Sequence, residues 1–307
     1  MSFLPRLFAL FILPLAFSTA VATAAPLRVV VTNSLLEDLV RSVAADEAEI
    51  VSLVPRGVDP HGYEPRPTDA RAVARAQLIF VNGLGFDSWV DRLVSSADAT
   101  DRTRVLTAGI APIVCDNPAH DHSHDHGHDH GDQDPHAWQD PRLVMRYIEN
   151  IRAALTAAAP ERAAVFAERA AAYTVELEKL HAESAAAFAA IPSERRVFIT
   201  SHDALAYLGR AYDLRIVAIR GVGNEREPSA RELADITAFI REQKVPAVFI
   251  ETTTNPRIAE LLARDAGVRL GEPLFTDSLG ETNGPAGTYL DLFRTNTARI
   301  VAALRAE

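Results

Sequence analysis

The sequence has little of what would stabilise a small secreted domain or bind nucleic acid. Its 307 residues include one cysteine, Cys115, which cannot form a disulfide within the chain, so the fold depends on packing. Lysine and arginine total 31 against 41 aspartates and glutamates, giving a net charge of −10. Because no cationic surplus exists to neutralise phosphates, we expect no nucleic-acid partner. No apolar run reaches the roughly 20 residues that a spanning helix needs.

The first 24 residues are typical of a signal peptide. Arg6 precedes an apolar run from Leu7 to Phe17, which Pro14 interrupts and small residues follow. Ala22-Thr23-Ala24 matches an A-x-A cleavage pattern, so we expect a mature periplasmic chain that begins after Ala24. No cysteine stands at this site, and we therefore expect no lipid anchor. The alternative, an N-terminal core helix, fits poorly with Pro14.

Short β-branched runs alternate with helical patterns in both halves of the chain. The strand-like runs are residues 27–32, 49–54, 78–83, 196–200, 215–219 and 247–251. Helix-like stretches are residues 35–45, 68–76, 233–241, 258–266 and a segment around Leu205. This alternation predicts an α/β fold with two lobes, each a parallel sheet flanked by helices. The predicted lobes are residues 25–159 and 192–307.

One long helix is predicted between the lobes, at residues 160–191. The segment has no glycine, and apolar residues recur every seven positions at Phe166, Tyr173, Leu180 and Ala187. A helix of this length would extend about 45 Å and act as a rigid connector. The alternative is a coiled-coil dimer stripe, but alanine-rich faces also pack against their own protein. We expect a monomer.

A histidine-rich loop is predicted at residues 116–133, where the sequence has no apolar periodicity. Its imidazoles alternate with aspartate and glycine and suit borderline divalent metals: His120, His122, His124, His126, His128 and His130. A flexible loop loses ordering entropy on binding, so we expect weak, variable metal collection there. An inert solubilising tract is the alternative. Cys115 beside it is a weak thiolate candidate.

A tighter metal site is predicted from four residues that lie far apart. His61 and His136 each follow an Asp-Pro pair, which holds the imidazole at a rigid turn. His202 follows the strand ending at Thr200 and is expected to open a helix, and Asp277 lies in the second lobe. Three imidazoles and one carboxylate make a tetrahedral set that favours zinc over manganese, magnesium or calcium.

Other polar residues near these positions have supporting or alternative roles. The candidates for accepting the spare imidazole N–H are Asp59, Asp134 and Asp203, although turn capping is the stronger expectation for the first two. Glu251 ends a strand and is either an alternative ligand or the partner of an arginine such as Arg220. Trp138 is a packing residue that would wall the site from water.

Several of these motifs together resemble a known family. DPHxYEP at 59–65, the histidine-rich loop, DPHxW at 134–138, the long helix, SHDAxxYL at 201–208, EPS at 227–229 and DSLG at 277–280 appear in a specific order. They resemble the zinc-type periplasmic solute-binding proteins of metal ABC transporters, the ZnuA- and AztC-like members of cluster A-I. The resemblance covers essentially the whole mature chain.

The resemblance implies metal bound between two α/β lobes and delivered to a membrane permease driven by a cytoplasmic ATPase. It places the ligands at His61, His136, His202 and Asp277, and manganese-type relatives have Glu at the position of His202. Water replaces the fourth ligand in some members. Many zinc-type members carry a disulfide that one cysteine cannot supply. A periplasmic zinc chaperone is a further partner to be tested.

Two other functions are considered. An exported zinc hydrolase would need an open coordination position and a general base, but the sequence has no HExxH and four ligands would close the shell. We therefore expect no enzymatic activity. An extracellular adhesin or a zinc buffer would also use these residues, since the histidine-rich loop alone can store metal.

Overall fold

The computed structural model describes residues 25–114, 133–222 and 227–305. The predicted signal peptide and its cleavage site, Cys115, and the histidine-rich segment from His120 to His130 lie outside these residues. Within the described ranges, no helix combines the length and the apolar character that crossing a bilayer requires.

The first lobe contains a parallel four-stranded sheet with the order β2-β1-β3-β4. Its strands are β1 Leu27–Val31, β2 Ala48–Ser52, β3 Leu78–Val81 and β4 Thr103–Val105. Helices α1 Ser34–Ala44, α2 Pro67–Arg75 and α3 Asp91–Ser96 connect or follow them. Three of these strands match predicted runs. The fourth is a short edge strand with exposed side chains, so it lacks the apolar run on which the prediction depended.

The second lobe repeats this design with the parallel order β10-β9-β7-β8. Its strands are β7 Val197–His202, β8 Arg215–Arg220, β9 Ala247–Val248 and β10 Arg269–Leu270, and its helices are α6 Ala206–Tyr212, α7 Ala230–Glu242 and α8 Arg257–Ala266. Both sheets have covering helices, which confirms the predicted α/β fold class. The proposed boundaries at residues 159 and 192 remain predictions.

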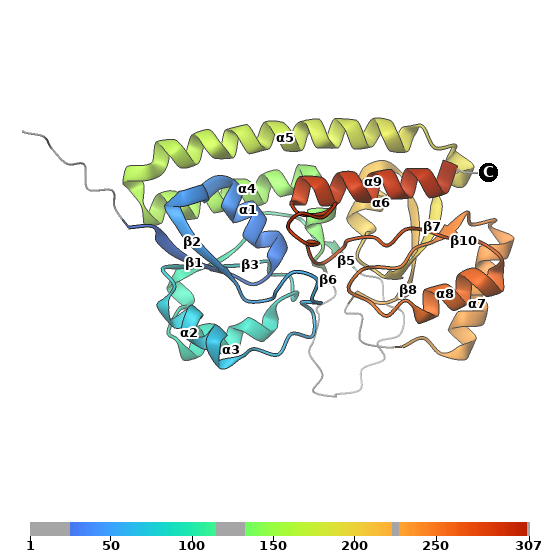
Figure 1. Cartoon of the computed structure of the whole chain (residues 1–307), viewed down its shortest axis with the longest axis horizontal. Coiled ribbons are helices and arrows are strands. Elements are labelled where there is room, and N and C mark those ends of the chain that lie inside the picture. Colours follow the sequence, from blue (N-terminus) through green and yellow to red (C-terminus); the bar gives the residue numbers. More distant parts are fainter. Residues whose placement is uncertain (1–24, 115–132, 223–226, 306–307) are drawn as a thin grey trace, which may run out of the picture.

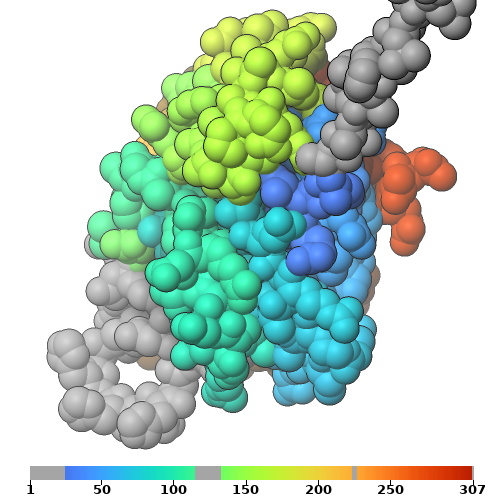
Figure 2. All heavy atoms as spheres, turned by 90° about the vertical axis from the view of Figure 1, so that its left-hand side faces the viewer, coloured from blue at the N-terminus to red at the C-terminus, as the bar shows by residue number. Residues whose placement is uncertain are grey.

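Three long helices form a layer along one side of both sheets (Figure 1). They are α4 Pro141–Ala158, α5 Ala163–Ala189 and α9 Tyr289–Arg305. The 27 residues of α5 extend about 40 Å, and the helix passes over both lobes. Figure 2 shows the beginning of this helix covering the upper end of the first lobe. The predicted long connector is confirmed, although its first three residues form a 3₁₀ turn.

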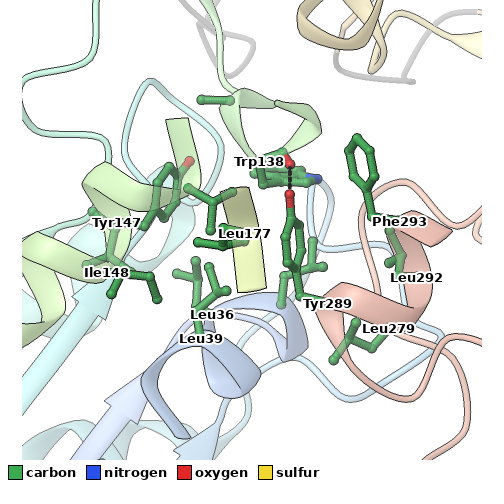
Figure 3. Packing of buried hydrophobic residues seen from close by; sticks show 14 of the residues in the cluster. Leu36, Leu39, Trp138, Tyr147, Ile148, Leu177, Leu279, Tyr289, Leu292 and Phe293 are labelled. Atoms are coloured by element: carbon green, nitrogen blue, oxygen red, sulfur yellow. Dashed lines mark hydrogen bonds between the residues drawn. The ribbon is translucent and has the colours of Figure 1, made fainter. Parts of the chain in front are cut away.

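The apolar stripe of α5 faces its own chain. Phe166, Leu177, Leu180 and Phe188 are buried in a core cluster that contains residues of both lobes and of α1, α4 and α9. Figure 3 shows this packing around Leu177 and Tyr289. Because these side chains already contact the protein's own core, the stripe offers no face for the coiled-coil dimer considered above.

A small antiparallel pair lies between the lobes, formed by β5 Ile113–Val114 and β6 Gln133–Asp134. The remaining regular segments are 3₁₀ turns at Ala45–Glu47, Ser88–Val90, Thr100–Arg102, Ala137–Gln139, Pro160–Arg162 and Ser193–Arg195. The pair β5 and β6 lies next to the turn that carries His136.

Candidate metal centre

Four side chains predicted as ligands converge between the two sheets. One ligand atom from each of His61, His136, His202 and Asp277 can be chosen so that all lie within 4.8 Å of one another. Their exposed fractions are 6%, 0%, 0% and 1%, respectively. Residues separated by more than two hundred positions therefore share one closed, solvent-excluded point.

The spacing of these atoms fits a single small cation. His136 Nε2 lies 3.3 Å from His61 Nε2 and 3.5 Å from Asp277 Oδ1. Asp277 Oδ2 lies 3.1 Å from His202 Nε2 and 3.8 Å from His61 Nε2. Ligands of a tetrahedral zinc ion, at about 2.0–2.1 Å from the metal, are separated by about 3.3 Å. Three of these separations, 3.1, 3.3 and 3.5 Å, are close to that value, and the fourth, 3.8 Å, is longer.

The two Asp-Pro-His sequences form the same local turn. Asp59 Oδ1 accepts a hydrogen bond from the His61 backbone N–H at 2.9 Å, and Asp134 Oδ1 accepts one from the His136 backbone N–H at 2.8 Å. These bonds span two residues, as in an Asx turn, and leave the imidazole in a defined orientation. The expectation of turn capping by both aspartates agrees with these bonds.

His202 is placed differently from the prediction. It is the last residue of β7 rather than the first of a helix, and α6 begins at Ala206. The extended backbone of β7 continues two residues beyond Thr200. At its end, the His202 backbone N–H donates to Glu251 Oε1 at 3.0 Å. The side chain still lies at the carboxyl end of a parallel strand, where open α/β sheets place ligand-binding residues.

Asp277 lies in the loop between β10 and α9, and residues of the first lobe form hydrogen bonds with this loop. Ser278 Oγ accepts from the Gly57 backbone N–H at 2.7 Å, and the Leu279 backbone N–H donates to Ser34 Oγ at 3.0 Å. Arg56 Nη1 donates to the carbonyl oxygens of Gly280 and Gly287, at 3.0 and 2.8 Å. The carboxylate therefore belongs to the second half of the sequence but is anchored to the first lobe.

Carboxylates orient two of the three imidazoles. Asp134 Oδ1 lies 2.8 Å from His136 Nδ1, so Asp134 both caps the turn and contacts the ring. Glu251 Oε2 lies 2.5 Å from His202 Nδ1. In both rings Nδ1 faces a carboxylate, and Nε2 is the nitrogen that faces the other predicted ligands.

The carboxylate that lies against His202 Nδ1 is Glu251, rather than Asp203, which the sequence offered as a candidate for accepting a spare imidazole N–H. Glu251 is outside the converging set among the described residues. Arg220 Nη2, its suggested partner, lies 3.8 Å from Glu227 Oε1. An isolated bridge pairs the Glu251 backbone with Leu274.

The site combines strong desolvation with closely opposed charges. Burial by itself lowers the pKa of His202, but the Glu251 and Asp277 carboxylates outweigh it and hold that pKa well above the ordinary value. Burial raises the pKa of Asp277, but His202 and then the other two histidines hold it well below its usual range. Neither Asp277 oxygen makes a well-aligned hydrogen bond among the described residues. A cation is the partner that would satisfy both.

Aromatic rings wall the site on the first lobe's side. Trp138 is buried, with its ring centroid 5.1 Å from that of His136, as the sequence predicted. Phe86, which the sequence analysis missed, lies 4.7 Å from the His61 ring. Phe86 follows a turn in which Gly83 has φ +87° and a Cβ there would lie 2.5 Å from Val105 Cγ1. The G-x-G sequence after β3 was the available signal.

Comparison with known proteins identifies the family. The family described as "Zinc-uptake complex component A periplasmic", ZnuA, matches residues 29–303. The manganese-binding lipoprotein MntA of Halalkalibacterium halodurans is 31% identical, covering 91% of this chain and 88% of its own length. The iron-binding protein YfeA of Yersinia pestis is also 31% identical, over 90% of this chain and 89% of its own.

A solved structure agrees with these sequence relationships. The periplasmic zinc-binding protein TroA of Treponema pallidum superposes with a TM-score of 0.82 at 30% identity, covering 92% of this chain and all of the TroA chain. The relatives are solute-binding proteins rather than enzymes, and their names give manganese, iron or zinc as the metal. This chain belongs to the ZnuA family of periplasmic metal-binding components of ABC importers.

Proposed function

We propose that this protein captures Zn²⁺ in the periplasm and delivers it to a membrane ABC permease with a cytoplasmic ATPase. His61, His136, His202 and Asp277 would hold the ion. The observation that carries the proposal is the convergence of three imidazoles and one carboxylate on one buried point. Manganese, magnesium and calcium prefer oxygen-rich sites, whereas a nitrogen-rich set of four suits zinc.

The buried position of the ligands supports a carrier rather than a catalyst. A catalytic zinc keeps an open position for water, whereas this site offers four protein ligands with exposed fractions of 6% or less. An ion can enter or leave only if the lobes separate. We propose that separation accompanies transfer to the permease, and that the histidine-rich segment from His120 to His130 collects zinc at lower affinity.

Metal competition tests the proposal. We expect the mature chain to bind one zinc tightly, with manganese and iron far weaker, in titrations against a chromophoric chelator that also include nickel and copper. His61→Ala, His136→Ala and His202→Ala should each weaken zinc binding by more than about a hundredfold, since losing a ligand exceeds the usual loss for an outer-shell partner. Deleting residues 116–133 should leave the tight site.

A matched control is His181→Ala, because this α5 imidazole contacts the Tyr212 hydroxyl at 3.0 Å and is not in the converging set. It should bind zinc like the parent. If the loop deletion abolished tight binding and the three alanine variants did not, the main site would lie in the loop. Loss of zinc-dependent uptake on deletion of the gene would distinguish transport from zinc buffering or adhesion.

A further inference from the structure

Phe86 is a fully buried ring that contacts two of the predicted ligands. Its ring centroid lies 4.7 Å from that of His61 and 5.8 Å from that of His136, with interplanar angles of 75° and 78°. Both arrangements are T-shaped, a geometry that aromatic pairs prefer. The Trp138 ring lies 4.8 Å from Phe86 and 5.1 Å from His136. Two apolar rings therefore lie against the imidazoles that the first lobe contributes.

The turn after β3 fixes the position of Phe86. The next residue, Asp87, is buried, and its Oδ2 accepts from the Asn82 backbone N–H and from Thr32 Oγ1, both at 2.6 Å. Asp87 Oδ1 accepts from the Gly83 backbone N–H at 3.0 Å. These bonds close the turn and join it to the residue that follows β1. The ring of Phe86 is therefore carried by a backbone with little freedom to move.

The two aromatic rings offer no free hydrogen-bonding group to a water molecule on this side of the site. Phenylalanine has none, and the Trp138 indole N–H donates to the Thr276 carbonyl oxygen at 2.8 Å. A water inside a protein needs about two to four polar partners. A water that approached a bound metal from the side of Phe86 would meet aromatic carbon in place of such partners, and it would have to displace the ring.

We infer that Phe86 is a specificity-determining residue: it excludes water beside His61 and His136 and so restricts a bound metal to the four protein ligands. Zinc accepts a tetrahedral shell of four, whereas manganese and magnesium prefer octahedral shells, and magnesium usually keeps several waters. The inference rests on the proposed function. It adds coordination number to donor type as a second determinant of metal choice.

Phe86→Ser tests this role by freeing most of the volume of the ring and adding a hydroxyl that can bind water. We expect the affinity for manganese relative to zinc to rise by about tenfold or more, the scale on which residues around a metal site act. Phe86→Leu keeps the position apolar and should leave this ratio close to that of the parent. A folded Phe86→Ser variant with the parent's ratio would overturn the inference.

The measurement is a competition titration of the full mature chain with Zn²⁺ and Mn²⁺. Phe166→Ser is the matched control, because this α5 ring is equally buried in the core and lies outside the converging set. It should lose stability, as Phe86→Ser does, and keep the parent's ratio of manganese to zinc affinity. An equal change of ratio in both variants would assign the effect to a loosened core and refute the role of Phe86.

The parent protein supplies a test that does not depend on the folding of a variant. Its Co²⁺ complex should absorb visible light strongly, as four-coordinate cobalt does, and the weak absorption of six-coordinate cobalt would refute the inference. Phe86→Ser should weaken this absorption as water enters the shell.

The same spectra separate this inference from the proposed function. If the parent prefers manganese to zinc, the proposed zinc function fails. The role of Phe86 is still decided by cobalt, because strong absorption that stays unchanged in Phe86→Ser would show that the ring does not limit the coordination number.

Discussion

Two histidines of the candidate site are oriented in the same chemical way by carboxylates at very different sequence distances. Asp134 is two residues from His136 and contacts both its backbone N–H and its ring. Glu251 is 49 residues from His202 and makes the same two kinds of contact. The first pairing follows from a local turn, whereas the second requires strands β7 and β9 to lie side by side.

At the same scale, we predict that zinc affinity falls as the pH is lowered from 8 to 5. The metal needs a neutral ring, and the neighbouring carboxylates hold the pKa of metal-free His202 well above 6.5. As the pH falls through this raised pKa, the protonated fraction grows and a proton competes with zinc, by about tenfold per pH unit for each proton displaced. The decline should therefore begin at a higher pH than it would for a histidine with the ordinary pKa of 6.5.

Chelator competition, corrected for the chelator's own titration, checks this profile. Calorimetry in two buffers of different ionisation enthalpy should detect proton release when zinc binds. An affinity that stays constant between pH 5 and 8 would argue against imidazole ligation.

At the scale of elements, a single tyrosine joins α6 to the pair β5 and β6. The Tyr207 hydroxyl accepts from the Ile113 backbone N–H at 3.1 Å and donates to the Asp134 carbonyl oxygen at 2.9 Å. It therefore contacts both strands, one of which carries the carboxylate that orients His136. Helix α6 follows β7, which ends at His202. The Tyr207 hydroxyl therefore links the segment next to His202 with the strand that carries Asp134, the carboxylate in contact with His136.

We predict that Tyr207→Phe lowers the free energy of unfolding by about 1–3 kcal/mol, because a buried N–H and a carbonyl oxygen lose a partner. Zinc affinity should fall several-fold as Asp134 becomes less constrained. Thermal unfolding and chelator competition check both effects. Tyr173→Phe is the matched control, since the buried Tyr173 hydroxyl has no hydrogen-bond partner among the described residues. Equal losses in the two variants would contradict the assigned role.

Helix α4, which the sequence analysis missed, had usable signals. Helix α4 begins with Asp140 as N-cap and Pro141 as its first residue, a favoured helix start. Its buried residues include Val144, Ile148, Ile151 and Leu155, which recur at helical spacing. Strand β10 had no such signal, because its two residues are exposed and its place is set by pairing with β9.

At the scale of the whole molecule, the two lobes share the loop that carries Asp277. Besides the bonds made by Ser34, Arg56 and Gly57, the Trp138 indole N–H donates to the Thr276 carbonyl oxygen at 2.8 Å. The Thr276 hydroxyl also donates to Glu251 of the second lobe at 2.7 Å. Asp277 is therefore held by a loop that is hydrogen-bonded to both lobes.

We predict that Arg56→Ala accelerates zinc release about tenfold. The substitution removes two hydrogen bonds from a charged donor to the loop, and a loss of about 1.4 kcal/mol corresponds to that factor. Stopped-flow chelation measures the release rate. Arg71→Ala, at an exposed position of α2, should release zinc at the parent rate. An unchanged rate for Arg56→Ala would show that this anchor does not retain the metal.

The sequence by itself determined what depends on near neighbours: the alternation of strands and helices, the long α5, and the Asp-Pro-His turns that orient His61 and His136. Periodicity and hydrogen bonds across two or three residues are sufficient for these features. Only the tertiary structure decided that Glu251 contacts His202 and that the first lobe anchors Asp277. Those contacts join residues 49 to 245 positions apart, and they form only when packing brings separate strands and loops together.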